Sequence, residues 1–180
     1  MKFYSSGSYW MAALMLCSLT AASAQTIFNV GEGAAKPGEP VKVPVELSAQ
    51  TDCTSALVRI EYDAVVLESP LALIGDLVGS DHVLDVYSPE AGRLNIAIYS
   101  PSGTEPFAAQ TGILFNLVFD IKADAQPGTV PISVANTGSP DLPSMDLTAV
   151  DGSTLSPTST PGSVTVLAKN STRAYWLLYP

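Results

Sequence analysis

The most regular segment of this 180-residue sequence reads Val41-Lys42-Val43-Pro44-Val45-Glu46-Leu47. Its apolar residues recur at every second position, which is the period of a β-strand with one face against a core. Pro44 has no backbone N–H to donate, so we expect this strand to lie at a sheet edge or to contain a bulge. The segment therefore predicts a half-buried strand.

The same period continues on both sides of this segment and separates inward from outward residues. Within 56–62, the expected core face is Ala56, Val58, Ile60 and Tyr62, and the opposite face is Leu57, Arg59 and Glu61. Within 94–99, Leu94, Ile96 and Ile98 are expected to face in, and Asn95, Ala97 and Tyr99 to face out. The alternation thus predicts which side chains are available to a partner.

Short strands at close intervals make up the rest of the predicted fold. The candidates are 26–30, 41–47, 56–62, 83–87, 94–99, 113–121, 130–135, 147–150 and 163–167. The segment 113–121 is the most continuously apolar, which predicts a central strand buried on both faces. Turn signals separate the strands at Lys36–Gly38, Gln126–Gly128, Asp151–Gly152 and Thr160–Gly162. This spacing predicts an all-β, antiparallel sandwich or barrel.

The first 24 residues have the pattern of a secretory signal peptide. A weakly positive start at Lys2 precedes the short apolar run 10–19 and the small-residue site Ala22-Ser23-Ala24, which predicts cleavage near Ala24. An uncleaved anchor is the alternative. We therefore expect a secreted protein, extracellular, at the cell surface or retained in a periplasm, with no membrane span in the mature part.

The predicted domain organisation is a leader at 1–24, one sandwich domain at 25–168 and a short tail at 169–180. The tail contains the apolar run 175–179 and is expected to pack on the sandwich or to dock a partner. Without the leader, Cys53 is left alone, so the fold must depend on packing rather than on an internal disulfide. A half-buried free thiol is expected there, with pairing to another chain as the alternative.

Composition and charge exclude several classes of function. Apolar residues make up 47% and charged residues 14%, which argues against a disordered chain. The 17 acidic and 8 basic residues give a net charge of −9. Since nucleic-acid affinity depends on neutralised phosphates, we expect no nucleic-acid partner.

Catalytic and metal-binding patterns are weak. His82 is the single histidine, so a site with several histidines is excluded, and we expect its ring at the surface with hydrogen-bonding partners. Glu61 and Asp63 have the spacing of a carboxylate pair, but nothing in the sequence places them in a cleft. We therefore predict no catalytic residue, no metal site and no cofactor, with a structural calcium held by loop carbonyls left open.

Five motifs, in order along residues 26–167, resemble the cohesin domain family. They are the PG turn and V-x-V-P-V strand of 33–45, the Y-D-x-x-V-L-E element of 62–68, the strand 92–96 with its S-G-T loop at 102–104, the central strand and PGT-x-PI turn of 112–132, and the closing strand 162–166. The resemblance implies a nine-stranded, jelly-roll-like sandwich without catalytic activity. It also implies a partner: cohesins dock dockerins, which are calcium-loaded helical modules of polysaccharide-degrading enzymes.

The resemblance implies a set of partner-binding residues on one sheet face. Carried over position by position, these are Ser55, Leu57, Asn95, Ala97, Ser100 and Gly103. Alternation had already placed Leu57, Asn95 and Ala97 on the outward side. Better-studied members carry polar or acidic residues where Leu57 and Ser100 stand here.

Two other functions fit the same fold. A carbohydrate-binding module could stack sugar rings on Tyr87 and Tyr99, the surface aromatics expected in the strands. Once the leader is removed, Trp176 is the one tryptophan left, and it lies in the tail. We therefore do not expect a strong aromatic platform for crystalline cellulose. An extracellular structural or adhesion protein is the third interpretation.

Overall fold

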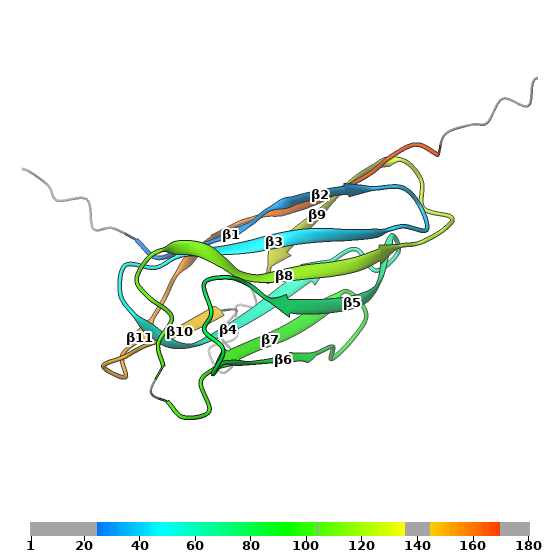
Figure 1. Cartoon of the computed structure of the whole chain (residues 1–180). Helices are drawn as coiled ribbons and strands as arrows, with labels where there is room; N and C mark the ends of the chain where they lie inside the picture. The colour runs from blue at the N-terminus through cyan, green and yellow to red at the C-terminus, as the bar shows by residue number, and fades with distance from the viewer. Residues whose placement is uncertain (1–24, 104, 136–144, 170–180) are drawn as a thin grey trace, which may run out of the picture.

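The computed structural model describes residues 25–103, 105–135 and 145–169, which form two β-sheets packed face to face (Figure 1). The strands are β1 (Ile27–Val30), β2 (Glu32–Ala35), β3 (Pro40–Ser48), β4 (Cys53–Tyr62), β5 (Leu67–Ile74), β6 (Val83–Tyr87), β7 (Arg93–Tyr99), β8 (Thr111–Ile121), β9 (Gly128–Val134), β10 (Met145–Ala149), β11 (Thr154–Leu155), β12 (Thr158–Thr160) and β13 (Gly162–Val166). The described residues contain no helix long and apolar enough to cross a membrane.

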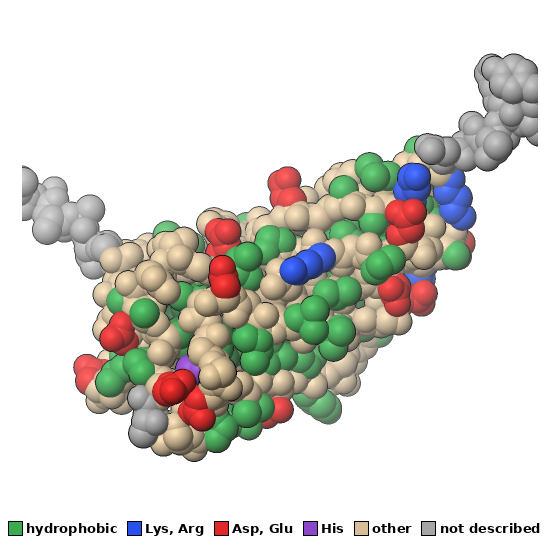
Figure 2. Space-filling model, in the orientation of Figure 1, with side chains coloured by type: hydrophobic (Ala, Val, Ile, Leu, Met, Phe, Trp, Pro, Cys, Tyr) green, Lys and Arg blue, Asp and Glu red, His purple; other side chains and the backbone are tan. Residues whose placement is uncertain are grey.

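One layer is a five-stranded sheet with the order β12-β1-β3-β8-β5. The long pair β3 and β8 runs antiparallel through its centre, from Pro40 opposite Asp120 to Ser48 opposite Thr111. A register shift next to Val45 inserts an extra residue in β8, which is the signature of a β-bulge. Hydrophobic side chains gather on the outer face of this sheet, over β8 and β5 (Figure 2), where Leu71 and Leu73 are exposed.

The other layer is an eight-stranded sheet that branches at β4. One edge of β4 pairs with β7, which in turn pairs with β6. The other edge is shared, since β10 pairs with the segment from Cys53 to Val58 and β9 pairs with the segment from Ile60 to Tyr62. From β9 the sheet continues through β13 to β2, and from β10 to β11. The strand β4 is therefore the centre of this layer.

The N-terminal and C-terminal strands change sheets together. β1 pairs parallel with β12 in the five-stranded sheet, and β2 pairs parallel with β13 in the eight-stranded sheet (Figure 1). Both changes occur at one place, where the N–H of Ser163 donates to the carbonyl of Gly31 at 3.2 Å. A Cβ on Gly162 would lie 1.9 Å from that carbonyl oxygen, so this crossing requires glycine for close backbone approach.

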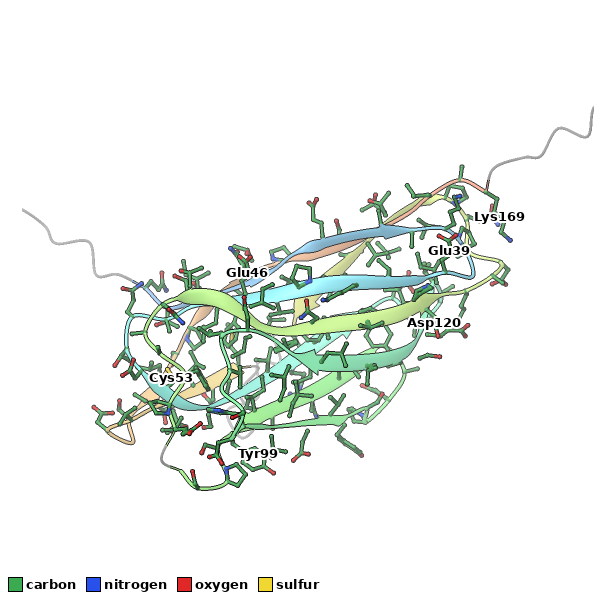
Figure 3. The ribbon with its side chains drawn as sticks, viewed as in Figure 1. Glu39, Glu46, Cys53, Tyr99, Asp120 and Lys169 are labelled. Atoms are coloured by element: carbon green, nitrogen blue, oxygen red, sulfur yellow. The ribbon has the colours of Figure 1, made fainter. Side chains whose placement is uncertain are left out.

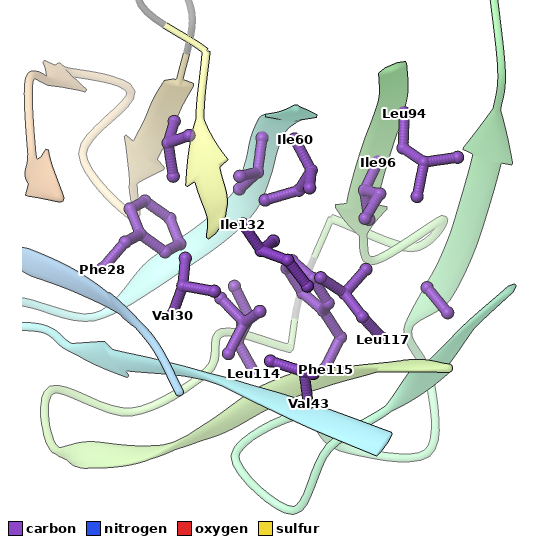
Figure 4. Close-up of a cluster of buried hydrophobic side chains, with 14 of the residues drawn as sticks. Phe28, Val30, Val43, Ile60, Leu94, Ile96, Leu114, Phe115, Leu117 and Ile132 are labelled. Carbon is purple, nitrogen blue, oxygen red and sulfur yellow. The ribbon is translucent and has the colours of Figure 1, made fainter. Parts of the chain in front are cut away.

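The core fills the space between the layers. Phe115 and Leu117 from β8 meet Ile60, Leu94 and Ile96 from the facing sheet, all essentially without exposure (Figure 4). Each such side chain contributes about 1.5–3 kcal/mol through removal from water. Tyr62 closes one part of the core, with its ring centroid 4.9 Å from that of Phe119.

The all-β sandwich class predicted from alternation is confirmed, and so are the inward and outward residues of β4 and β7. The central position of the apolar strand is also confirmed, since β8 lies between β3 and β5. Burial on both faces is limited to residues 114–117, because Val118 is half-buried and Asp120 is exposed. The two parallel pairings are a difference from the antiparallel expectation. They arise because the first and last strands run side by side in the same direction.

Four strands were not predicted: β2, β5, β11 and β12. In β2, Gly33 lies so close to β3 that a Cβ would come within 2.7 Å of Val41, so small residues replace the apolar alternation. In β5, a register shift between Glu68 and Leu71, with Ser69 at a φ of 51°, interrupts the period of two. The strands β11 and β12 are only two and three residues long.

Pro44 does not mark a sheet edge, because β3 is paired on both sides, although the bulge offered as the alternative lies next to it. The carbonyl of Pro44 accepts a hydrogen bond from Gly31 at 2.8 Å, just where β1 leaves the sheet. A residue's N–H and C=O point to the same side of a strand, so the missing donor faces a place where pairing ends anyway.

Cys53 is fully buried, which corrects the expected half-buried thiol. Its backbone pairs with Phe107, and Figure 3 shows its side chain at one end of the space between the sheets. Burial, followed by the negative charge of Asp52, raises the pKa of this thiol from 9.0 to about 11. A protonated, enclosed thiol is chemically inert.

We predict that Gly162→Ala lowers the free energy of unfolding by about 3 kcal/mol, because the added methyl group collides with the Gly31 carbonyl. Gly128→Ala is the matched control, since nothing lies within 4 Å of a Cβ at that position, and it should change stability by less than about 1 kcal/mol. Urea unfolding of both variants measures the difference. Equal effects would contradict the crossing as a steric constraint.

We also predict that the thiol of Cys53 does not react with an aromatic disulfide reagent at pH 8 while the protein is folded, because it is protonated and enclosed. Reaction should follow promptly once urea unfolds the chain. The absorbance of the released aromatic thiolate reports the rate. The measurement uses a Cys17→Ser chain, so that Cys53 is the only thiol. Fast labelling of this folded protein would disprove the burial.

Candidate functional site

The outer face of the eight-stranded sheet carries most of the predicted partner-binding residues. It is formed by β10, β4, β7 and β6, which lie side by side in that order. Residues directly opposite one another in antiparallel strands share a face, so the register defines rows of neighbouring side chains. The rows are Asp146, Leu57, Ala97 and Asp85; Thr148, Ser55, Tyr99 and Val83; and Arg59, Asn95 and Tyr87. We call these eleven residues the β4–β7 face.

Four of the six predicted partner-binding residues meet on this face. Leu57 and Ala97 are paired directly, and Ser55 and Asn95 lie in the rows on either side. Leu57 keeps 37% of its surface exposed in the middle of the sheet. The face therefore has a small apolar centre at a position where a flat partner could cover it.

The other two residues lie beyond the end of β7. Gly103 is exposed in the following loop and has a φ of 67°. Ser100 is placed off the face: only 8% of it is exposed, and its Oγ donates to Asp81 Oδ2 at 2.6 Å. Ser100 therefore holds the loop through Asp81, and its role in partner binding stays a prediction.

Tyr87 and Tyr99, the predicted sugar-stacking residues, share the β4–β7 face but belong to different rows. Figure 3 shows Tyr99 on the side of the sheet away from β8. Its hydroxyl donates to Asp85 Oδ2 at 3.0 Å, and this hydrogen bond, with the charge of Asp85, raises the pKa of Tyr99. Tyr87 is 65% exposed. The two rings are separated along the sheet by the row that contains Asp85.

The apolar centre lies between two carboxylates, Asp85 on β6 and Asp146 on β10. A positive charge lies in the row next to that of Leu57, where Arg59 Nε donates to Asn95 Oδ1 at 3.0 Å. Arg93, next to it, pairs with Glu61 at 3.2 Å and with Glu90 at 2.6 Å. The face thus has an apolar centre with charged groups beside it, and Val83, Tyr87 and Tyr99 add exposed apolar surface in the outer rows.

Sequence reasoning did not single out Asp85, Asp146 or Arg59 as site residues. Arg59 had been placed on the outward side of its strand, and the same alternation in 83–87 would have placed Asp85 outward. Their adjacency to Leu57 depends on which strands pair. Asp146 lies one residue before the strand predicted at 147–150, which is why it was missed.

His82 corrects another expectation. It is buried, with 5% exposure, and neither ring nitrogen has a hydrogen-bond partner among the described residues. Its ring packs against Phe107 with centroids 5.7 Å apart. The position of His82 just before a strand suggested a surface residue. In the structure, Phe107 packs against its ring and helps to bury it.

The acidic side chains and the histidine of the described residues form no metal-binding group. No group of three or more His, Cys, Asp or Glu side chains there could hold a metal ion. The carboxylates that had the spacing of a pair have structural roles: Glu61 pairs with Arg93, and Asp63 accepts a hydrogen bond from the N–H of Val65 at 2.8 Å. A cavity of about 300 Å³ lies away from the β4–β7 face, between Pro37, the turn 123–127 and Lys169. None of the predicted site residues lines this cavity.

Comparison with known proteins agrees with the architecture. The family model for the cohesin domain matches residues 27–169. Cellulose-binding protein A of Clostridium cellulovorans is 29% identical over 109 residues, which is 61% of this chain and 6% of that protein. The chain therefore spans a small fraction of this curated relative.

Solved structures with the same fold include two cohesins in complexes. CaCohA2 of Clostridium acetobutylicum, in a complex with a variant of CaDoc0917 at pH 5.5, is 25% identical with a TM-score of 0.66, covering 79% of this chain and 99% of that one. The sixth cohesin of scaffoldin B from Acetivibrio cellulolyticus, in complex with a mutant Cel5 dockerin, is 21% identical with a TM-score of 0.68, covering 80% of this chain and 100% of that one.

We predict that Ser100→Ala raises the pKa of Asp81 toward its ordinary value of 3.8, because hydrogen bonds from Ser100 and then Ser102 lower it. A lowered carboxyl pKa stabilises the fold above the ordinary pKa, and this contribution is lost as the pH falls through the lowered value. The variant should therefore lose stability at pH 6 and approach the wild type in strong acid.

A carboxyl-detected NMR titration measures the pKa of Asp81 in the variant. Ser88→Ala is the control, because the Ser88 hydroxyl donates to the backbone carbonyls of Glu90 and Arg93. An unchanged Asp81 titration in Ser100→Ala would show that the loop is held in another way.

Proposed function

Because this chain belongs to the cohesin domain family, we propose that it is a non-catalytic docking module whose β4–β7 face binds a dockerin. The observation that carries the proposal is the row through Leu57 and Ala97, an apolar centre flanked by Asp85 and Asp146 in the middle of a rigid sheet. CaCohA2 and the scaffoldin B cohesin, which share the fold, have been crystallised with dockerin-type partners.

The apolar centre would supply most of the affinity. Interfaces derive their binding energy from a few buried anchors, which contribute about 2 kcal/mol or more each. Leu57 is exposed enough to be covered and is surrounded by side chains that hold their positions, such as the Tyr99 and Asp85 pair. The small side chain of Ala97 lets a partner helix approach the sheet closely.

The charged rim would supply selectivity. Asp85 and Asp146 favour partners with basic groups at matching positions, and a like-charged partner would be repelled. Leucine at position 57 replaces the polar or acidic residue of better-studied cohesins. We infer that the partner presents an apolar side chain at this point.

The setting of the module is also a proposal. The signal-peptide pattern of 1–24 lies outside the described residues, and it supports a function outside the cytoplasm. A relative named for cellulose binding supports a role connected with polysaccharide degradation or with assembly at a cell surface. Direct sugar binding at Tyr87 and Tyr99 stays a prediction from sequence.

We predict that Leu57→Arg weakens dockerin binding by about 100-fold, because it places an unpaired charge at the centre of the interface. Leu73→Arg is the matched control: Leu73 is 47% exposed on β5, on the outer face of the opposite sheet, and its replacement should leave binding within about twofold. Titration calorimetry against a panel of purified dockerin modules measures both. Circular dichroism verifies that each variant is folded.

Equal loss of binding in both variants, or none in either, would remove the β4–β7 face as the docking surface. If the wild-type chain binds no dockerin but is retained on a polysaccharide column, and Tyr87→Ala abolishes that retention, the carbohydrate-binding alternative replaces the proposal.

A further inference from the structure

A small pocket opens at the end of the β4–β7 face that carries Arg59. It measures about 210 Å³ and is lined by Arg59, Pro89, Glu90, Arg93 and Asn95. Arg59 and Asn95 come from the adjacent strands β4 and β7, and Pro89 and Glu90 come from the connection between β6 and β7. The pocket is therefore built on the same strands that carry Leu57 and Ala97.

Arg59 differs from the other arginine in this pocket. Arg93 is neutralised by Glu61 and Glu90, at 3.2 and 2.6 Å. Arg59 uses only its Nε, which donates to Asn95 Oδ1 at 3.0 Å. Among the described residues, no carboxylate pairs with Arg59 and none accepts a hydrogen bond from its two Nη atoms.

The Asn95 contact fixes the orientation of this guanidinium. A planar group held through Nε keeps its two Nη atoms pointed in one direction, which is the geometry for two parallel hydrogen bonds to a carboxylate. A preoriented side chain also loses less entropy when a ligand binds. The Arg59 pocket is thus ready for an anion of the size of a carboxylate.

Among the described basic side chains, Arg93 has carboxylate partners, and Arg59 is distinguished by a guanidinium that is held in place without one. The net charge is −9, with 17 acidic residues. The described lysines with side-chain contacts lie elsewhere: Lys122 donates to the Ala64 carbonyl and Lys169 to the Ala123 carbonyl. Despite this excess of acid, Arg59 has no counterion within the described part of the chain.

We propose that the Arg59 pocket binds an aspartate or glutamate side chain of the docked protein partner. The class of partner, a protein, rests on the docking function proposed above. Since Asp85 and Asp146 lie in the row of Leu57, next to the row of Arg59, a partner would meet negative charge beside Leu57 and positive charge at Arg59. The pocket therefore sets the direction in which the partner lies across the strands.

The test selects peptides from a phage-displayed library of short random sequences on the immobilised full chain. Peptides that also bind Arg59→Gln are removed in a counter-selection. We expect the remaining peptides to share an acidic residue and to bind Arg59→Gln about tenfold more weakly than the wild type, which corresponds to the loss of a hydrogen-bonded charge pair. Arg59→Lys should fall between the two, because it keeps the charge and loses the planar fork.

Lys42→Gln is the matched control, since Lys42 is on β3 in the opposite sheet. The substitution removes the same charge and should leave the affinity within about twofold. Replacing the shared acidic residue of a peptide by its amide should weaken binding to the wild type and have little further effect on Arg59→Gln, as a double-mutant cycle requires for a direct pair. The proposal is overturned if no peptide distinguishes wild type from Arg59→Gln, if the selected peptides share no acid, or if the two substitutions are additive.

The peptide experiment and the dockerin titration test the two proposals independently. If the wild-type chain binds no dockerin while the selected peptides depend on Arg59, the pocket stands and the dockerin assignment does not. If dockerins bind through Leu57 and no peptide depends on Arg59, the docking function stands and the pocket proposal is wrong.

Discussion

The close approach of two backbones at Gly31 and Gly162 is the constraint on which the rest of the sandwich depends. At this point the first and last strands pass together from the five-stranded to the eight-stranded sheet, joined by the bond from the Ser163 N–H to the Gly31 carbonyl. A side chain at Gly162 would occupy the position of that carbonyl. Because the crossing joins the two layers through backbone contacts, each sheet gains a parallel terminal pair, and the core between them is closed at this edge.

That closure leaves the centre of the eight-stranded sheet free for function. Of the terminal strands, β13 pairs with β9, so β4 is bordered by β10, β9 and β7. The outward side chains of β4 form rows with those of β10, β7 and β6. Packed core residues under these strands hold the rows in place, with Val58, Ile96 and Leu147 buried beneath the face. A flat surface supported in this way suits docking of a preformed partner better than enclosure of a small molecule.

Charge divides the same surface. The chain as a whole is acidic, and two carboxylates border the apolar centre, while Arg59 lies in the row at one end of the face, with Arg93 just beyond it. Within the described part of the chain, these two arginines differ: Arg93 is bound to internal acids and Arg59 is not. The consequence is a face with a defined direction, on which apolar contact provides affinity and unlike charges at the two positions provide orientation.

Alternation in the sequence by itself determined the fold class and the facing of β4 and β7, including the outward position of Leu57, Asn95 and Ala97, because the period of a strand is a local property of the chain. Only the tertiary structure decided which strands are neighbours, and therefore that Asp85 and Asp146 flank Leu57 and that Arg59 meets Asn95. The tertiary structure also decided that β2 needs small residues at a close crossing. It likewise decided that His82 is buried against Phe107 and that Ser100 donates a hydrogen bond to Asp81. These features depend on pairing and packing between segments far apart in the chain, which no local pattern specifies.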